Sequence, residues 1–561
     1  MKVLSGLLVS NFNTGNLARY LENDEESPKI ECTSAPFGQV MATLLAPADN
    51  AKPDFAIVWT SPEHVSAEYG RCLDGRQYNA DALRNEVDQF SAAITQFAGR
   101  ASVVFVATLS PITDAVTSSL AGMRVGGASR LLAEMNLRLA DNLRECRNVY
   151  LLDSARWTEK SGDRPRDPKL WYLAKVPFAN DVFLAAVRDI KGCLRGITGS
   201  ARKLVILDLD DTLWGGLVGD VGWEKLRLGG HDPAGEAFVD FQRSLKALSR
   251  RGVILAVVSK NEEHIALEAI DRHPEMVLRR SDLAGWRINR VDKARNIVEL
   301  VHQLNLGLDS VVFIDDSPVE RARVRETLPE VLVPEWPADS MLYPRALADL
   351  RCFEWPAVTA EDAARTEMYN SERTRAELLE RVGSVDEWLK SLQLRVDVEE
   401  VGGANFERVV QLLNKTNQMN LATRRLTDKE FRAWLAGEGR RSWCFRVTDR
   451  LGDSGITGLL SLERQHDAAV IRDFVLSCRV MGRKVEETML HVAVDYAQSA
   501  GLREVRAEYI PTPRNQPCLE FLERAGFPGR DGEQTFVWYT NQQCPLPEAI
   551  SCTTERWRAT V

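Results

Sequence analysis

The sequence predicts a multidomain α/β protein with three folded segments. Its 561 residues exceed what one hydrophobic core normally organises, which indicates about three or four domains. Two segments, 1–195 and 200–345, alternate short apolar runs with helical patterns, as parallel α/β sheets do. A third segment, 391–545, places several strands in succession between helices and therefore predicts an α+β domain.

In the first segment three apolar runs predict buried strands, at Phe55–Trp59, Ala101–Val106 and Asn148–Asp153. Between the last two, Ala128–Leu143 carries apolar residues at helical spacing. The basic, glycine-containing stretch Lys191–Lys203 is the expected junction to the next segment.

The second segment repeats this alternation more clearly. Strands are expected at Leu204–Leu207, Val253–Val258 and Val311–Ile314, and helices at Ala237–Arg251 and Asp292–Leu304. We therefore expect a parallel sheet with helices between its strands.

Residues 346–390 are charged and helix-favouring, and we expect them to link or brace the domains. The third segment ends at residue 545, and 546–561 is expected to be a tail. Its predicted strands are Leu394–Glu400, Trp443–Val447, Ile456–Leu462, Ala468–Leu476 and Glu504–Tyr509, and its later helices are Val485–Ala500 and Gln516–Ala525.

Composition excludes several classes of protein. The apolar fraction of 44% and charged fraction of 27% are those of a globular protein, and a net charge of −9 argues against a nucleic-acid binder. No stretch approaches the roughly 18 apolar residues of a membrane span, and no targeting segment is recognisable. The ten cysteines include no CxxC pair, which favours reduced thiols over disulfides or a zinc site. We expect a cytoplasmic protein with neither nucleic acid nor membrane as partner.

Two aspartates mark the end of the first strand in the second segment. Asp208 directly follows the strand, where α/β sheets place ligand sites, and Asp210 lies two residues further on. This spacing allows Asp208 to attack a phosphorus atom while Asp210 protonates the leaving oxygen. The pair is thus compatible with phosphoryl transfer.

The other two strands end in residues that complete this chemistry. Ser259 offers a hydroxyl to a phosphoryl oxygen, Lys293 begins the next helix with a neutralising charge, and Asp315-Asp316 supplies oxygen ligands suited to Mg²⁺. The carboxylates would otherwise repel each other and an incoming phosphate, so a cation and Lys293 must compensate them together. Each motif alone is more often a solvated loop, but their order after apolar strands favours a functional site.

The spacing of these motifs excludes a large cap over the site. The intervals Thr212–Ser259 and Ser259–Lys293 are each shorter than about 50 residues, the lower limit for a domain. An open site favours a large or carrier-tethered substrate, although the WGG loop could form a small cap.

This constellation resembles the haloacid-dehalogenase (HAD) superfamily in its FkbH-like branch. The resemblance implies a HAD-like Rossmannoid sheet without a large cap, Asp208 as nucleophile, Asp210 as acid/base, and Mg²⁺ held by the Asp208 carboxylate, the Asp210 backbone, Asp315 and Asp316. We place Thr212, Lys260 and Asn261 among the substrate-binding residues. Arg290 and Ser317 stand where relatives usually carry tryptophan and asparagine. The motifs that carry the resemblance are LDLDDTLWGGLVGDVGWEKLRLGG (207–230), VVSKNEE, the lysine of INRVDKARNI, and VFIDDSPVERARVR.

A basic turn opens the long helix of the third segment. Its backbone amides around Gly482 can cradle a pyrophosphate, with Arg479 and Arg483 adding positive charge, although a basic helix start is more often ordinary surface. The turn resembles the acyl-coenzyme-A motif of the GNAT acetyltransferase fold. Lys484 stands where that motif ends in glycine or alanine, which favours a phosphopantetheine arm on a carrier protein over coenzyme A.

Cys478, beside Arg479, is a candidate to carry an acyl group as a thioester. A small buried hydrophobe at a strand end is an equally good interpretation of this cysteine. We also expect four residues of the preceding NKTNQMNLATRRLT stretch to bind glyceryl or phosphate groups. They are Asn417, Asn420, Arg424 and Arg425.

The first segment resembles the SGNH-hydrolase domain of long FkbH-like proteins, through LLVSNFNTGNL, VWTSPEHV, LLAEMNLRLA and PKLWYLAKVPF. That class uses a serine near the first strand and a late Asp-x-x-His, which correspond here to Ser10 and to Asp153 with Arg156. Arginine cannot supply histidine's general base. We therefore expect a binding or scaffolding domain without esterase activity.

The FkbH-like resemblance extends over nearly the whole chain, adding DRLGDSGITG, LSCRVMGRKVEE and YIPTPRNQPCLEFLERAGF. It implies an enzyme that takes a glyceryl group from 1,3-bisphosphoglycerate and loads it, dephosphorylated, as a thioester on an acyl carrier protein for polyketide-type biosynthesis. One alternative is a HAD phosphatase of a small metabolite with an appended acyl-CoA-dependent acetyltransferase-like domain. Another is a non-catalytic assembly-line scaffold.

Overall fold

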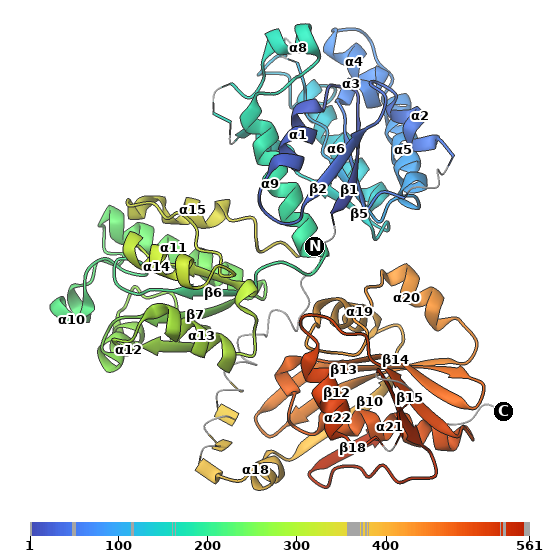
Figure 1. Cartoon of the computed structure of the whole chain (residues 1–561). Coiled ribbons are helices and arrows are strands. Elements are labelled where there is room, and N and C mark those ends of the chain that lie inside the picture. Colours follow the sequence, from blue (N-terminus) through green and yellow to red (C-terminus); the bar gives the residue numbers. More distant parts are fainter. Residues whose placement is uncertain are drawn as a thin grey trace. The chain divides into compact units, whose positions relative to one another are not determined.

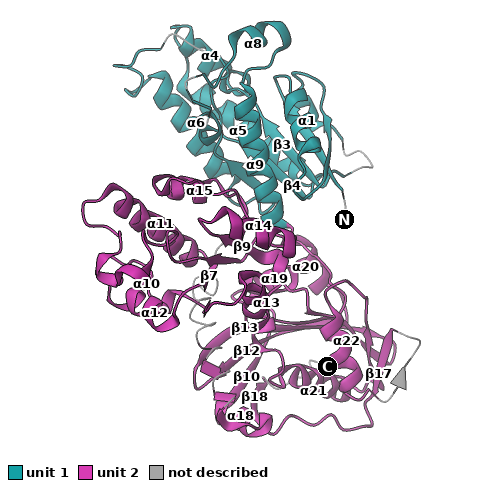
Figure 2. Ribbon diagram, turned by 60° about the vertical axis from the view of Figure 1, so that its left-hand side comes forward, with its two compact units in different colours: residues 1–197 teal, residues 198–561 magenta. Residues whose placement is uncertain are grey.

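A computed structural model gives the fold of the chain, with its elements labelled in Figure 1. It describes residues 3–47, 52–113, 117–159, 161–162, 164–355, 371, 374–375, 378–379, 381–527, 529–530 and 534–554. The chain divides into two compact units, Met1–Ile197 and Thr198–Val561, which Figure 2 shows in two colours.

Unit 1 is a parallel α/β domain. Its five strands pair in the order β2-β1-β3-β4-β5, all parallel. Helices α1 and α9 pack on one face, and α2, α5 and α6 pack on the other. The elements are β1 (Leu4–Ser10), α1 (Gly15–Asn23), β2 (Ile30–Ser34), α2 (Val40–Leu45), β3 (Phe55–Trp59), α3 (Pro62–Val65), α4 (Ala67–Leu73), α5 (Ala80–Ala98), β4 (Val103–Ala107), α6 (Ala128–Leu143), β5 (Val149–Leu152), α7 (Ala155–Glu159), α8 (Pro168–Ala174) and α9 (Asn180–Ile197).

Unit 2 begins with a second parallel sheet, in the order β8-β7-β6-β9. Its central strands are Val-, Ile- and Leu-rich because helices cover both faces: α11 and α12 pack on one, and α13 and α14 on the other. The elements are β6 (Leu204–Leu207), α10 (Val218–Val221), η1 (Trp223–Lys225), α11 (Pro233–Arg250), β7 (Ile254–Ser259), α12 (Glu263–Arg272), η2 (Arg280–Asp282), β8 (Gly285–Ile288), α13 (Lys293–Gln303), η3 (Leu308–Ser310), β9 (Val311–Ile314), α14 (Pro318–Thr327), η4 (Ser340–Leu342) and α15 (Tyr343–Asp349).

The last part of unit 2 is built on a mixed sheet, in the order β16-β17-β15-β14-β13-β12-β10-β18, with β11 paired to β14. Helices α18, α21 and α22 pack on one face, and α19 and α20 on the other. The elements are α18 (Val385–Leu392), β10 (Leu394–Glu400), α19 (Phe406–Lys415), β11 (Met419–Asn420), α20 (Asp428–Leu435), β12 (Arg440–Asp449), β13 (Gly452–Gln465), β14 (Ala468–Leu476), η5 (Cys478–Val480), α21 (Val485–Ser499), β15 (Glu504–Glu508), α22 (Gln516–Arg524), β16 (Gly529–Arg530), β17 (Thr535–Tyr539) and β18 (Ile550–Thr554).

The two parallel sheets and the mixed sheet lie in the three predicted segments, but they contain more strands than the sequence predicts, including β2 in the first sheet and β11, β16 and β17 in the mixed sheet. The four-residue strand β8, Gly-Trp-Arg-Ile with buried ends and two partly buried central residues, adds a fourth strand to the second sheet. The expected tail supplies β18, which pairs in parallel with β10 and so extends the last domain to Thr554. Much of the expected linker, including 356–370, and residues 555–561 lie outside the described residues.

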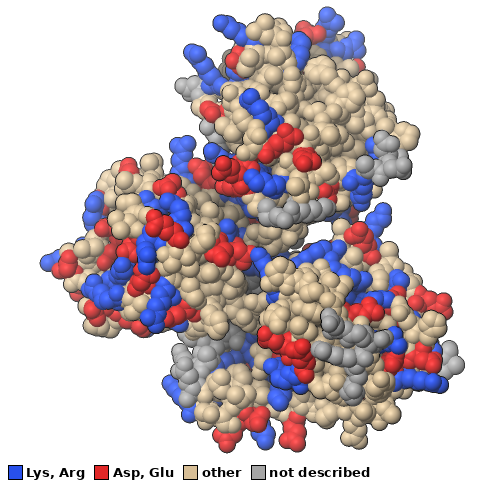
Figure 3. Space-filling model, in the orientation of Figure 1, with Lys and Arg blue, Asp and Glu red and all other residues tan. Residues whose placement is uncertain are grey.

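Among the described residues, no helix combines the length and apolarity needed to cross a membrane. All ten cysteines lie in the described part of the chain, and none of them forms a disulfide. On the face drawn in Figure 3, acidic and basic side chains are interspersed, as expected of a chain with a mild net charge.

Candidate functional site

The strand register of the second sheet brings two carboxylates together. Leu207 of β6 pairs with Ile314 of β9, so the next residues, Asp208 and Asp315, leave the sheet side by side. The amide of Asp208 still donates to the carbonyl of Ile314, at 3.0 Å. Asp316 follows Asp315, and one carboxylate oxygen from each of the three aspartates lies within 4.8 Å of the others.

Lys293, the first residue of α13, supplies the positive charge at this cluster. Its side chain is 4% exposed, with Nζ 2.5 Å from Asp315 Oδ2 and 3.2 Å from Asp208 Oδ2. Burial alone would lower the pKa of Lys293, but attraction to the two carboxylates outweighs burial and raises it. Lys293 is therefore a fixed cation.

One lysine does not neutralise three carboxylates. Burial raises the pKa of Asp208 to about 6, with Lys293 opposing and the charge of Asp315 reinforcing the rise. Burial also raises the pKa values of Asp315 and Asp316. Asp208 Oδ1 is buried and has no hydrogen-bond partner. The excess negative charge and this unpartnered oxygen fit a divalent cation with oxygen ligands, such as Mg²⁺.

Asp210 is held by three donors in the turn after β6. Its Oδ1 accepts from Trp214 Nε1 at 2.9 Å and from the Val218 amide at 3.1 Å, and its Oδ2 accepts from Asn261 Nδ2 at 2.9 Å. Asn261, expected to bind substrate, thus orients Asp210 as well. Trp214 is the tryptophan of the WGG loop, which was expected at most to form a small cap, and its contact with Asp210 was not predicted.

Three further predicted site residues have different surroundings near the carboxylate cluster. Ser259 is 2% exposed, and its side chain opposes the rise in the pKa of Asp208. Thr212 is fully buried, where its hydroxyl donates to Asp316 Oδ1 at 3.2 Å and accepts from the Asp316 amide at 3.1 Å. Lys260 forms a surface ion pair with Glu320, at 2.6 Å. Thr212 and Lys260 therefore fasten the loops around the site rather than face a substrate.

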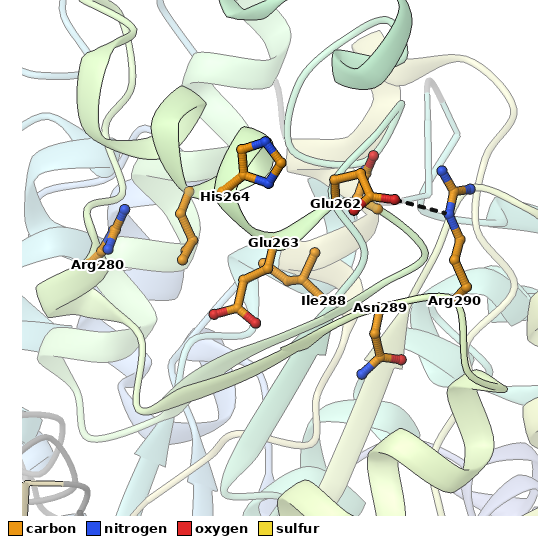
Figure 4. A pocket seen from close by; sticks show the side chains of 9 residues that line it. Glu262, Glu263, His264, Arg280, Ile288, Asn289 and Arg290 are labelled. Atoms are coloured by element: carbon orange, nitrogen blue, oxygen red, sulfur yellow. Dashed lines mark ion pairs between the residues drawn. The ribbon is translucent and has the colours of Figure 1, made fainter.

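A pocket of about 610 Å³ adjoins Asp210 through Asn261. Figure 4 shows its charged lining, in which Arg290 Nε lies 4.0 Å from Glu262 Oε1. His264 of α12 and Arg280 of η2 also line the pocket. The excursion between β6 and α11 contains only the short helices α10 and η1. A pocket therefore lies beside Asp210, and the described residues of this domain form no large cap over the site.

The basic turn of the third segment lies between β14 and α21. Cys478 is half-buried in η5, and its carbonyl accepts from Asn305 Nδ2 at 3.0 Å. Arg479 Nε donates to the Ser477 hydroxyl at 3.1 Å. Arg483, expected to bind phosphate, is instead 3% exposed and lies 3.7 Å from the buried carboxylate of Asp449.

The expected substrate residues of the 414–427 stretch bind the protein itself. Asn420 is 1% exposed in β11 and bonds to Thr416 and Thr423. Arg424 forms a bidentate pair with Asp473, a residue of β14. Arg425 bonds to Asn417 and to a backbone carbonyl. These contacts secure β11 against β14, so the prediction that Asn417, Asn420, Arg424 and Arg425 bind substrate has no support in the geometry.

In unit 1, Ser10 ends β1, is 6% exposed, and accepts a hydrogen bond from the Phe12 amide. Asp153 and Arg156 are exposed after β5 and in α7. This placement adds no general base to Ser10, and the absence of esterase activity stays a prediction.

No family model matches the sequence, and no curated protein matches it either. Among solved structures, the chain is similar to the N-terminal part of protein BF1531 from Bacteroides fragilis, which contains a phosphatase domain and is complexed with Mg. The two sequences are 30% identical and the TM-score is 0.58. The match covers 64% of this chain and 95% of the BF1531 chain. It also matches the ribosomal-protein-S18-alanine N-acetyltransferase of Escherichia coli at 10% identity and TM-score 0.20, over 26% of this chain and 96% of that one. A GNAT-family acetyltransferase of Staphylococcus aureus matches at 11% identity and TM-score 0.21, over 26% and 99%.

Proposed function

Because the chain belongs to the same protein family as BF1531 of Bacteroides fragilis, we propose that it is a magnesium-dependent phosphatase joined to an acyltransferase domain. Its reaction loads a glyceryl group from 1,3-bisphosphoglycerate, a small phosphorylated three-carbon donor, onto the phosphopantetheine thiol of an acyl carrier protein and removes the remaining phosphate. The observation that carries the proposal is the buried cluster of three carboxylates around Lys293.

The metal of this proposal is Mg²⁺, which the solved part of BF1531 contains. Asp208, Asp315 and Asp316 would hold it, with the Asp210 backbone as a further ligand. When bound, it would supply charge neutralisation for the phosphoryl group.

The chain's own residues divide the phosphatase step between them. A carboxylate oxygen of Asp208 bonds to phosphorus as the bond from phosphorus to the leaving oxygen breaks, and Asp210 gives its proton to that oxygen. Water then attacks the phosphorus, phosphate leaves, Asp208 is regenerated and Asp210 takes back a proton. Trp214 and Asn261 hold the Asp210 carboxylate in place, and Lys293 offsets charge on the phosphoryl oxygens.

Intact-mass analysis of the full chain and a candidate carrier, incubated with 1,3-bisphosphoglycerate and Mg²⁺, tests the complete reaction. We expect the carrier to gain the mass of a glyceryl group. With Asp208→Asn, we expect phosphoglyceryl to accumulate on the carrier, because acyl transfer continues without phosphate removal. A chain that releases phosphate from small esters but never modifies a carrier would instead be a plain phosphatase.

Cys478 is the proposed acyl acceptor on the enzyme, since its thiol is half-buried beside Arg479. We expect Cys478→Ala to lower the rate of carrier loading to about one hundredth or less, with phosphate release from small esters unchanged. Cys544→Ala is the matched control, because burial raises the pKa of that thiol to about 11 and makes it a poor nucleophile at neutral pH. If Cys478→Ala loaded the carrier at the rate of the unaltered protein, the phosphopantetheine thiol would take the acyl group directly from the donor.

A further inference from the structure

The turn between β14 and α21 has the backbone shape of an anion site. Gly482 and Lys484 both adopt left-handed conformations, with φ of 75° and 63°, so successive amides curve toward the start of α21. Curved amides at the start of a 15-residue helix attract negative charge. This geometry would suit the pyrophosphate of coenzyme A.

The chain fills this site with its own carboxylate. Glu486 Oε1 accepts from the Gly482 amide at 2.9 Å. The residue is 2% exposed, and its Oε2 is buried without a hydrogen-bond partner. An amide that would meet a pyrophosphate is thus already engaged, and a carboxylate oxygen without a hydrogen-bond partner lies beside it.

One cation of the turn, Arg483, points inward. Arg483 Nη2 donates to the carbonyl of Arg479 at 2.5 Å, and Nη1 lies 3.7 Å from Asp449 Oδ2. Asp449 also receives a bidentate pair from Arg375, which is 2% exposed. Arg483 therefore cannot offset a phosphate at the turn without leaving a buried carboxylate.

Burial raises the pKa of Glu486 to about 6, and the neighbouring charge of Glu487 adds to the rise. Most copies of Glu486 are still ionised near pH 7.5. A pyrophosphate would have to displace this anion or share the Gly482 amide with it, and like charges at close range repel strongly away from water.

We infer that Glu486 is a specificity-determining residue that excludes pyrophosphate from the turn before α21, so that the C-terminal domain takes a thiol arm lacking this group. The inference rests on the proposed function, in which this domain handles an acyl thioester. A carrier-bound phosphopantetheine arm has the required chemistry, because it keeps the thiol and the amides of coenzyme A and lacks the nucleotide pyrophosphate.

Calorimetric titration of the full chain with coenzyme A and with pantetheine tests this inference. In the unaltered protein we expect coenzyme A to bind no more tightly than pantetheine. In Glu486→Ala, which empties the turn, we expect coenzyme A to bind about tenfold more tightly or better, while pantetheine is unaffected. Glu407→Ala is the matched control, since it removes an exposed acidic residue from the first turn of α19 and should change neither affinity.

Tighter binding of coenzyme A than pantetheine by the unaltered protein, by about tenfold or more, would overturn the inference. A folded Glu486→Ala protein with no gain for coenzyme A would overturn it equally. If Glu486→Ala does not fold, Glu486→Gln replaces it, because glutamine keeps an oxygen that accepts from the Gly482 amide but removes the negative charge. A gain in coenzyme A affinity is again expected. Absence of that gain in Glu486→Gln would contradict the proposal. Phosphate release from small esters, measured in parallel, should be unchanged, so a failure of the phosphatase assignment is seen separately.

Discussion

Asp208→Asn abolishes phosphate release from a small phosphomonoester such as para-nitrophenyl phosphate, with an expected fall in kcat of about a thousandfold or more. The amide that replaces the carboxylate has the same shape but no oxygen able to form a bond to phosphorus. It also removes a buried charge whose desolvation raises the pKa of Asp208 to about 6. The variant should therefore be folded, with a urea midpoint no lower than that of the unaltered protein.

Asp211→Asn is the control for this prediction, because it removes one negative charge only three residues away. Asp211 is exposed, adopts a left-handed backbone with φ of 51°, and accepts from the Gly216 amide at 2.8 Å, all of which asparagine tolerates. We expect phosphate release by Asp211→Asn to remain within severalfold of the unaltered rate. If both variants lost only the same small part of the phosphate-release rate, Asp208 would not be the nucleophile.

The central strands could be predicted because burial on both faces leaves near-continuous apolar runs. β6 and β9 lie where the sequence places them, and β7 is shifted by one residue. Their parallel register then follows from alternation with helices, which is why Asp208 and Asp315 could be expected at one edge of the sheet. β8 escaped prediction because four residues that include an arginine carry too weak a pattern.

The orienting contacts could not be predicted, since they join residues whose proximity exists only in the fold. Trp214 reaches Asp210 around one turn, and Arg321 donates to the carbonyls of Asp315 and Asp316 from inside α14, at 2.8 and 2.6 Å. Both residue types have common alternative roles in core and surface. No local spacing distinguishes these roles.

At the basic turn before α21, the sequence predicts a ligand contact where the structure shows contacts within the protein. Arg483 in a glycine-containing helix start indicates an anion site, but its partner Asp449 lies 34 positions earlier, at the end of β12. The carboxylate that fills the turn, Glu486, is four residues after Gly482 and could have been suspected from that spacing. The pattern indicates the positive charge of Arg483 but not the negative charge of Glu486, which fills the turn.

Lys293→Met should be the most destabilising single substitution at the candidate site. It removes the cation between two buried carboxylates and leaves Asp208 and Asp315 side by side, at an expected cost of about 3–5 kcal/mol in the free energy of unfolding without metal. Methionine nearly matches the lysine stem in length, so lost packing contributes little. Urea unfolding at neutral pH in EDTA measures the effect.

Lys260→Met is the matched control, because Lys260 belongs to the same site but pairs with Glu320 at the surface, 40% exposed. Exposed pairs contribute about 1 kcal/mol or less, so its urea midpoint should barely move. Adding Mg²⁺ should restore part of the stability of Lys293→Met, since a dication compensates the same carboxylates. If both variants unfold at the same urea concentration, Lys293 does not neutralise the cluster, and the electrostatic basis of the proposed phosphatase site is wrong.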